Sequence, residues 1–229
     1  MTNDPTLTEM NPTEPNWSCA ALVTIDMQFD FATPAGSCFV PGTDRIRPTL
    51  HKLVTAFRQS NKPIFHAIRL YLNDGSNAER CRRESLRAGA AIVRPGTSGA
   101  NLADGCGLPN SLDTSDMIEN PWKQEGIVEW VFYKPRWSAF FDTELASRLK
   151  ELNVDTIVVA GCNFQNCPSA TLFDATERDF RVVLASDAVS GISAAGLEWC
   201  NGIGVDPLST QVIESSVLAS VRQMCHISR

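Results

Sequence analysis

The chain has 229 residues and a formal net charge of −6; 43% of its residues are hydrophobic and 20% are charged. This length suffices for a domain with a sizeable core, and the acidic balance argues against a dedicated nucleic-acid-binding protein, which would normally be basic. No apolar stretch approaches the ~18 residues of a membrane span, so we do not expect the chain to cross a membrane. Neither a nucleic acid nor a membrane is therefore expected as a partner.

The first 16 residues are polar and contain three prolines. We predict a flexible N-terminal arm over residues 1–16 and a single domain over residues 17–229. The arm lacks the charged-then-apolar pattern of a signal peptide, so we expect a cytoplasmic protein in reducing surroundings.

Eight cysteines are scattered along the chain, with no CxxC pair and only three histidines. This pattern does not match a zinc motif, and a disulfide framework is not expected in a reducing compartment. Most of these cysteines are expected to be small buried hydrophobic residues. We therefore predict neither a metal nor another cofactor.

The predicted elements begin with "AALVTI", a short apolar run that indicates a buried strand ending at Asp26. A loop rich in proline and glycine follows. Residues 46–61 have apolar side chains at helical spacing and predict an amphipathic helix. Residues 63–70, "PIFHAIRL", predict the next strand. Residues 73–126 are long, charged and glycine-rich, which indicates an insertion over one edge of the domain.

Strands and helices continue to alternate after the insertion. We predict a strand over residues 126–134 that ends at Lys134, a helix over 143–153, a strand over 154–161, a helix over 169–180 and a strand over 181–188. Near-continuous apolar strands that alternate with helices are typical of a parallel sheet covered on both faces. The predicted fold is α/β: a three-layer α/β/α domain with a mainly parallel, roughly six-stranded, Rossmann-like sheet.

Three predicted strands end in chemically useful groups, namely Asp26, Lys134 and the loop from Gly161 to Cys167. In an open α/β sheet, ligands bind outside the carboxyl ends of the strands, so these groups are expected to converge. Separately, Asp26 can be a turn cap and Lys134 a surface lysine. Together they supply a nucleophile, a base and an electrostatic stabiliser.

Cys167 precedes Pro168 and a helical pattern, and proline is favoured in the first turn of a helix. The thiol is therefore expected at or near a helix start, where free N–H groups and the helix dipole favour negative charge. This position predicts a lowered thiol pKa and donors for an oxyanion. The alternative is an inert, packed cysteine.

The segments "TIDMQFDF", "KPRWSAFFDTEL" and "GCNFQNCPSATLFDATERDFRVVLASDAVSG" resemble, in order, the three signature segments of the isochorismatase-like cysteine hydrolases. That superfamily includes nicotinamidases, N-carbamoylsarcosine amidase, streptothricin hydrolase, and biuret, triuret and ureidoacrylate amidohydrolases. The resemblance covers roughly residues 19–215.

The resemblance implies a catalytic triad of Asp26, Lys134 and Cys167 that cleaves an amide through a thioester. It also implies a cis peptide bond between Cys162 and Asn163, and an oxyanion hole made by the backbone N–H groups of Asn163 and Cys167. In this interpretation the thiol of Cys162 is incidental. A homo-oligomer, dimer or tetramer, is implied as well.

Two departures from the family patterns narrow the reaction. Metal-containing nicotinamidases carry an Asp and a His where this chain has Leu70 and Leu72, so a metal site is not expected and nicotinamide is disfavoured as substrate. True isochorismatases lack the nucleophilic cysteine, so Cys167 disfavours hydrolysis of a vinyl ether.

Several side chains are candidates for substrate binding. The aromatic residues among them can wall a small pocket or simply pack in the core. The candidates are Phe31, Arg69, Trp137, Phe164, Gln165 and Gln211. Four arginines in residues 79–89 can receive an acidic substrate, although a solvated helix face or subunit salt bridges is the favoured interpretation of that segment.

The predicted function is cleavage of a carbon–nitrogen bond in a small amide or ureido compound, with biuret, triuret or a carbamoyl compound favoured. Three alternatives stay open at this point. The chain can be a non-catalytic binding member of the fold, a redox protein that cycles a Cys162–Cys167 disulfide, or a hydrolase of a cyclic amide such as a streptothricin-type lactam.

Overall fold

The computed structural model describes residues 11–107 and 112–227, and the side chains only as far as residue 221. Most of the predicted N-terminal arm, residues 1–10, lies outside this part. The described end of the arm is fixed to the domain, because Asn16 donates hydrogen bonds to the side chains of Thr156 and Asp155.

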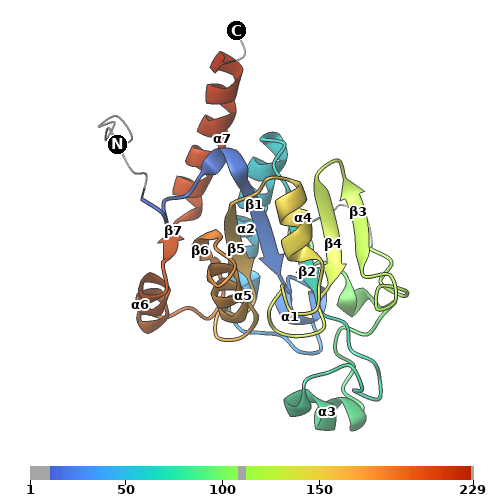
Figure 1. Cartoon of the computed structure of the whole chain (residues 1–229). Coiled ribbons are helices and arrows are strands. Elements are labelled where there is room, and N and C mark those ends of the chain that lie inside the picture. Colours follow the sequence, from blue (N-terminus) through green and yellow to red (C-terminus); the bar gives the residue numbers. More distant parts are fainter. Residues whose placement is uncertain (1–10, 108–111, 228–229) are drawn as a thin grey trace.

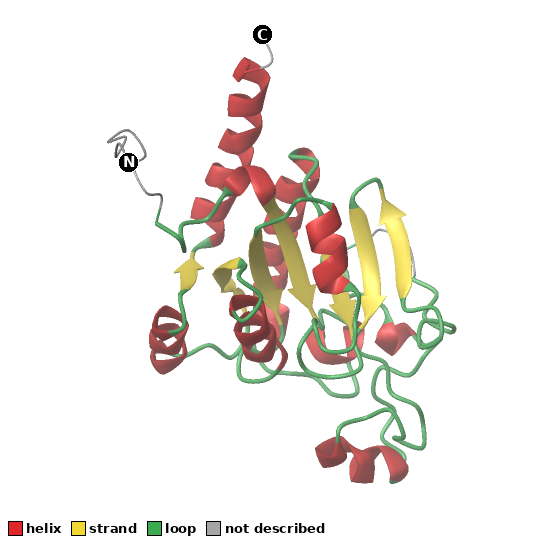
Figure 2. Ribbon diagram, viewed as in Figure 1, coloured by secondary structure: helices red, strands yellow, loops and turns green. Residues whose placement is uncertain are grey.

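The described residues form a seven-stranded sheet in the order β3-β4-β2-β1-β5-β6-β7 (Figures 1 and 2). Every neighbouring pair is parallel except β3 and β4, which are antiparallel. The strands are β1 (Ala20–Ile25), β2 (Ile64–Ile68), β3 (Trp122–Gly126), β4 (Glu129–Tyr133), β5 (Thr156–Gly161), β6 (Arg181–Val189) and β7 (Val205–Leu208). The predicted mainly parallel α/β sheet is confirmed.

Helices cover both faces of the sheet, which gives the predicted three layers. Helices α2 and α7 pack on one face through residues such as Phe57 and Val217, and α4, α5 and α6 cover the other through residues such as Leu149 and Leu172. The α-helices are α1 (Phe29–Ala32), α2 (Thr43–Gln59), α3 (Arg80–Arg87), α4 (Leu145–Glu151), α5 (Cys167–Thr176), α6 (Ala194–Gly202) and α7 (Thr210–Ile227), with 3₁₀ turns η1 (Trp17–Cys19) and η2 (Ser98–Ala100). No helix in the part that the structure describes is long and apolar enough to cross a membrane.

Strands β3 and β7 explain why the sheet has more strands than predicted. Both lie at the edges, where burial is incomplete and the apolar pattern is weak. Strand β3 has the polar sequence WKQEG, and β7 contains Pro207, which an edge strand tolerates because its outer side needs no N–H donor.

The predicted insertion over residues 73–126 holds α3, η2 and β3. Helix α3 stands away from the layers, on the side of the sheet where β1 and β4 end (Figure 1). It is joined to the domain through buried Leu86 and through Glu79, which forms an ion pair with Arg69 of the segment after β2. The insertion therefore reaches the carboxyl edge of the sheet.

Candidate active site

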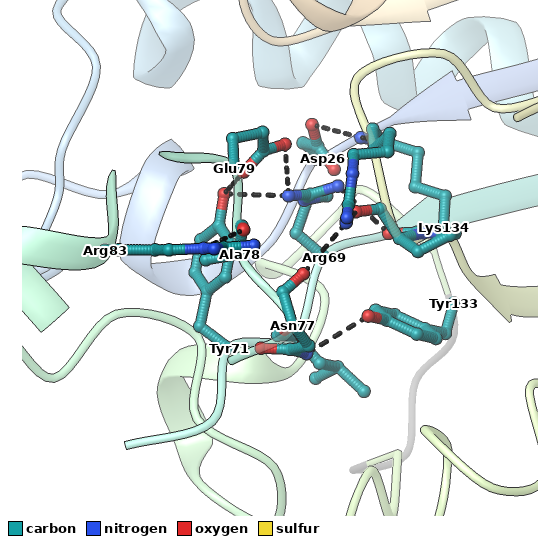
Figure 3. Close-up of polar contacts among 12 residues, drawn as sticks. Asp26, Arg69, Tyr71, Asn77, Ala78, Glu79, Arg83, Tyr133 and Lys134 are labelled. Atoms are coloured by element: carbon teal, nitrogen blue, oxygen red, sulfur yellow. Dashed lines mark hydrogen bonds and ion pairs between the residues drawn. The ribbon is translucent and has the colours of Figure 1, made fainter. Parts of the chain in front are cut away.

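The three strand ends that the sequence marks as reactive meet at one edge of the sheet. Asp26 follows β1, Lys134 follows β4, and Cys167 begins α5 in the connection after β5. Lys134 Nζ lies 2.9 Å from Asp26 Oδ2, and the lysine is fully buried (Figure 3). Removing one partner of such a buried pair costs several kcal/mol, because the other charge would be left without a counter-ion.

A small pocket of about 90 Å³ opens over this edge. The carboxylate of Asp26 and the thiol of Cys167 share it, so a candidate base and a candidate nucleophile face the same bound molecule. The lining residues are Asp26, Phe31, Val40, Arg69, Tyr71, Arg82, Trp137, Cys162, Asn163, Asn166 and Cys167.

The close approach of β1 and β5 brings Asp26 to the loop that carries Cys167. Gly161 ends β5 with a φ of 122°, and a Cβ atom there would lie 2.2 Å from the carbonyl oxygen of Ile25. That same carbonyl accepts a 2.9 Å hydrogen bond from the N–H of Cys162. Only glycine allows this contact together with a positive φ.

Asp26 itself has a φ of 51°, in the left-handed region that residues other than glycine seldom occupy. Its N–H donates to the carbonyl of Ala67 at 2.9 Å, which holds the residue against β2. Strained backbone of this kind gathers at functional sites, where the surrounding structure enforces it. Here it turns the chain sharply at the point where the carboxylate enters the pocket.

Only one of the two carboxylate oxygens of Asp26 is hydrogen-bonded within the described chain. Oδ2 accepts the hydrogen bond from Lys134, whereas buried Oδ1 has no hydrogen-bond partner within the described chain. An unpaired oxygen on a buried carboxylate is costly unless a ligand or reaction step uses it. Oδ1 is thus the atom available to take a proton from Cys167.

The prediction of a lowered pKa for the thiol of Cys167 is wrong. Burial raises the pKa of the thiol to about 12, the negative charge of Asp26 raises it further in the same direction, and Lys134 opposes the rise. Cys167 is 8% exposed. The helix start exists as predicted, but burial and the neighbouring carboxylate favour the neutral thiol.

The prediction of a cis peptide bond is also wrong. The described residues contain no cis peptide bond, so Cys162 and Asn163 are joined by a trans bond. The trans form is favoured by about 3 kcal/mol for a residue that is not proline. Even so, no protein acceptor in the described chain takes the N–H groups of Asn163 and Cys167, and both residues line the pocket.

Arg69 lines the pocket as predicted, but its guanidinium is largely occupied. Nη2 is paired with the carboxylate of Glu79 and also donates to the hydroxyl of Tyr71 at 3.0 Å, and Nη1 donates to the carbonyl of Lys134 at 3.2 Å (Figure 3). The positive charge of Arg69 is therefore balanced by Glu79, although its buried Nε has no hydrogen-bond partner among the described residues.

The other candidates divide into two groups. Phe31 and Trp137 line the pocket, and Phe164, Gln165 and Gln211 are not among its lining residues. Phe164 packs edge-on against Trp199 with ring centroids 5.9 Å apart. Gln165 is exposed near the carbonyl of Gly191, and Gln211 is exposed at the start of α7. For Phe164 and Gln165, proximity to Cys167 in sequence did not place the side chain in the pocket.

Tyr71, Arg82, Asn166 and Val40 line the pocket but were absent from the predicted substrate-binding set. The amide of Asn166 can bind a carbonyl, and Arg82 is one of the four arginines that can receive an acidic substrate, but the sequence did not rank either above its neighbours. Tyr71 and Val40 lie in loops with no pattern that indicates a site.

The side chains around this pocket do not form a metal-binding cluster within the part of the chain that the structure describes. Within the described residues, no group of three or more His, Cys, Asp or Glu side chains is arranged to hold a metal ion. The carboxylate in the pocket is instead paired with an ammonium group, a partner that competes with a cation.

The fold and this site define an α/β protein with a buried thiol, carboxylate and lysine at the carboxyl edge of a mainly parallel sheet. The chain belongs to the isochorismatase domain family, whose model matches residues 20–111 and 117–201. The predicted family is thereby confirmed.

The relatives include amidohydrolases and one protein described as inactive. A probable inactive nicotinamidase of Arabidopsis thaliana is 32% identical over 197 residues, which cover 82% of this chain and 91% of the relative. Maleamate amidohydrolase of Pseudomonas putida is 27% identical over 169 residues, covering 74% of this chain and 71% of that protein. The crystal structure of an isochorismatase family protein from Desulfovibrio vulgaris matches with a TM-score of 0.74 at 28% identity, covering 88% of this chain and 98% of that one.

Proposed function

We propose that this protein is a metal-independent cysteine amidohydrolase that cleaves a carbon–nitrogen bond in a small amide or ureido compound and releases ammonia or an amine. The observation that carries the proposal is the shared pocket of Cys167 and Asp26, with the lysine of the buried pair behind the carboxylate. The small volume of the pocket favours a substrate of few atoms, such as a linear amide or a carbamoyl compound.

The reaction begins with transfer of the Cys167 thiol proton to Oδ1 of Asp26 as the sulfur attacks the amide carbonyl carbon. The N–H groups of Asn163 and Cys167 donate to the resulting oxyanion. Asp26 then gives the proton to the leaving nitrogen, the C–N bond breaks, and a thioester with Cys167 is left.

Water completes the cycle. Asp26 takes a proton from the water molecule, the hydroxide attacks the thioester carbon, and the C–S bond breaks as the proton returns to the sulfur. Lys134 donates its hydrogen bond to Oδ2 of Asp26 during both formation and hydrolysis of the thioester, and so holds the carboxylate in place. The products are the carboxylic or carbamic acid and the free thiol.

The raised pKa of Cys167 fits a mechanism in which the proton leaves as the C–S bond forms. A thiol with a pKa near 12 is almost entirely protonated at neutral pH, so a free thiolate is not the resting nucleophile. An adjacent carboxylate with an unpaired oxygen supplies the acceptor at the moment of attack.

Cys167→Ala tests the proposal. We expect ammonia release from a panel of biuret, triuret, N-carbamoyl amino acids, ureidoacrylate, nicotinamide and monoamides of dicarboxylic acids to fall at least about 10⁴-fold on the best substrate, since the covalent intermediate is lost. Cys162→Ala is the matched control, because it removes the neighbouring buried thiol and leaves the proposed nucleophile in place. Full turnover by folded Cys167→Ala protein would overturn the proposal.

A non-catalytic binding role is the second candidate, favoured by the high pKa of Cys167 and by the description of the Arabidopsis relative as probably inactive. Iodoacetamide separates the two functions. If Cys167 is an activated nucleophile, it is alkylated faster than buried Cys162 or Cys200. Equal, slow labelling of all three thiols would favour the binding role.

A further inference from the structure

Helix α3 brings a second guanidinium to the pocket. Arg82 lines the same cavity as Cys167 and Asp26, although it belongs to the insertion and not to the sheet. Its side chain makes no hydrogen bond within the described chain, and no described carboxylate lies within ion-pair distance of it. Arg82 is half-buried, so this charge faces the pocket without a matched partner.

The other arginines of α3 differ from Arg82. Arg80 is exposed and does not line this pocket, Arg83 donates to the carbonyl of Ala78 at 3.0 Å, and Arg87 donates to the carbonyl of Asp74 at 3.2 Å. Those three fit the solvated helix face that the sequence favours. The arginine-rich segment thus combines a solvated face with one side chain directed to the site.

The charges around the pocket do not balance. Asp26 is paired with Lys134 and Arg69 with Glu79, which leaves the charge of Arg82 over when Cys167 is a neutral thiol. Partial burial lowers the pKa of Arg82, but the nearby groups, Tyr71 first and then Cys38, Glu79 and Cys167, outweigh it and hold the pKa above its ordinary value. The guanidinium stays charged throughout the pH range of an assay.

We propose that Arg82 receives a carboxylate of the substrate, so that the preferred substrates are small acid amides or ureido acids with the carboxylate a few bonds from the scissile carbonyl. This inference rests on the proposed function, because it assigns the scissile amide to Cys167 and the anion to Arg82. A carboxylate fits the planar fork of a guanidinium through two parallel hydrogen bonds. The small cavity keeps the two ends of such a molecule close together.

The proposal makes Arg82 a specificity-determining residue and not a catalytic one. It binds a part of the substrate that does not react, so its loss weakens binding of anionic substrates and leaves neutral amides unaffected. The insertion then supplies substrate preference, and the sheet edge supplies the chemistry.

The first test compares succinamate, which bears a carboxylate, with succinamide, which replaces it by a neutral amide of similar size. We expect Arg82→Met to reduce kcat/KM for succinamate by about 10- to 100-fold, mainly through KM, and to change that for succinamide by less than about twofold. Arg80→Met is the matched control, because it removes the same charge from an exposed position of the same helix and is expected to change neither rate.

The second test does not need turnover. Iodoacetate and iodoacetamide alkylate the same sulfur, but only iodoacetate is an anion. The rate of Cys167 labelling by iodoacetate relative to iodoacetamide is expected to fall about tenfold in Arg82→Met and to stay constant in Arg80→Met, as measured by mass spectrometry of the Cys167 peptide.

The outcomes separate this inference from the proposed function. If Cys167 is labelled and amides are hydrolysed, but Arg82→Met leaves both ratios unchanged, the carboxylate assignment is wrong and the amidohydrolase function stands. If neither reagent labels Cys167 selectively and no amide is hydrolysed, the proposed function fails, and the inference fails with it.

Discussion

Two buried charge clusters lie in this sheet, and they differ in how completely their polar atoms are paired. The sheet-core cluster consists of Arg58 of α2, His66 of β2 and Glu129 of β4, with Thr24 of β1. Arg58 binds both oxygens of Glu129 at 2.6 and 2.8 Å, and His66 contacts Glu129 at 2.8 Å and Thr24 at 2.7 Å. None of their buried side-chain polar atoms is without a partner in the described chain.

The active-site cluster is Asp26, Lys134, Arg69 and Glu79. It contains comparable ion pairs, yet Oδ1 of Asp26 and Nε of Arg69 have no hydrogen-bond partner among the described residues. Each unpaired buried polar group costs about 1–3 kcal/mol, so pairing its polar atoms favours a cluster that only stabilises the fold. Incomplete pairing beside a pocket therefore distinguishes the active-site cluster, to which we assign the proposed chemistry, from the sheet-core cluster.

One substitution in each cluster tests the difference between them. Asp26→Asn, in the active-site cluster, is expected to have the larger effect on activity and stability. Loss of the base should lower kcat/KM about 10³-fold. The charge of buried Lys134 loses its counter-ion, which should also lower the free energy of unfolding by about 3 kcal/mol. Ammonia release and urea unfolding measure the two effects.

The double variant Asp26→Asn/Lys134→Met separates these effects. We expect it to recover much of the lost stability, because no unpaired charge stays buried, and to recover none of the activity. Activity that returned together with stability would show that Asp26 acts only as a structural counter-ion.

Glu129→Gln probes the sheet-core cluster. It should lower the free energy of unfolding by about 2 kcal/mol, less than a fully buried pair would lose, because Arg58 is one-third exposed and water screens its charge. Turnover by the folded variant should stay within about twofold of the unmodified protein, because no member of this cluster lines the pocket. A large loss of turnover with stability intact would contradict the division between the clusters.

The smallest expected effect is the pH dependence of that stability difference. Burial raises the pKa of Glu129, but hydrogen bonds from Arg58 and His66 outweigh it and lower the pKa to about 2 from about 4.5. A depressed carboxyl pKa stabilises the fold above pH 4.5, and this contribution is lost as the pH falls towards 2. Urea unfolding should show the gap between the unmodified protein and Glu129→Gln narrowing over that window, whereas a constant gap would refute the assigned pKa.

The strands that are completely buried could be predicted from the sequence. Strands β1, β2 and β5 are buried along their whole length, so their apolar runs are visible in the sequence, and their ends locate Asp26 and the loop to Cys167. Edge strands β3 and β7 escaped prediction because half-exposed residues carry no such run.

The sequence cannot rank the pocket residues in the same way. The position of Arg82 depends on how an inserted helix lies over the edge of the sheet, and four arginines in one segment look alike until it folds. The pKa of Cys167 depends likewise on burial and on a carboxylate 141 positions earlier in the chain. Local signals identify the helix start, but only the folded surroundings determine whether it favours the thiolate.

Gly161 has a consequence for how the site can be lost. Because a single Cβ at this position would collide with the carbonyl of Ile25, a larger residue would force β1 and β5 apart where the base meets the nucleophile loop. Asp26, Lys134 and Cys167 would all remain in such a chain, so the presence of the three residues in a sequence would not reveal the change. A methyl group added at Gly161 is therefore expected to abolish the proposed activity while leaving Asp26, Lys134 and Cys167 unchanged.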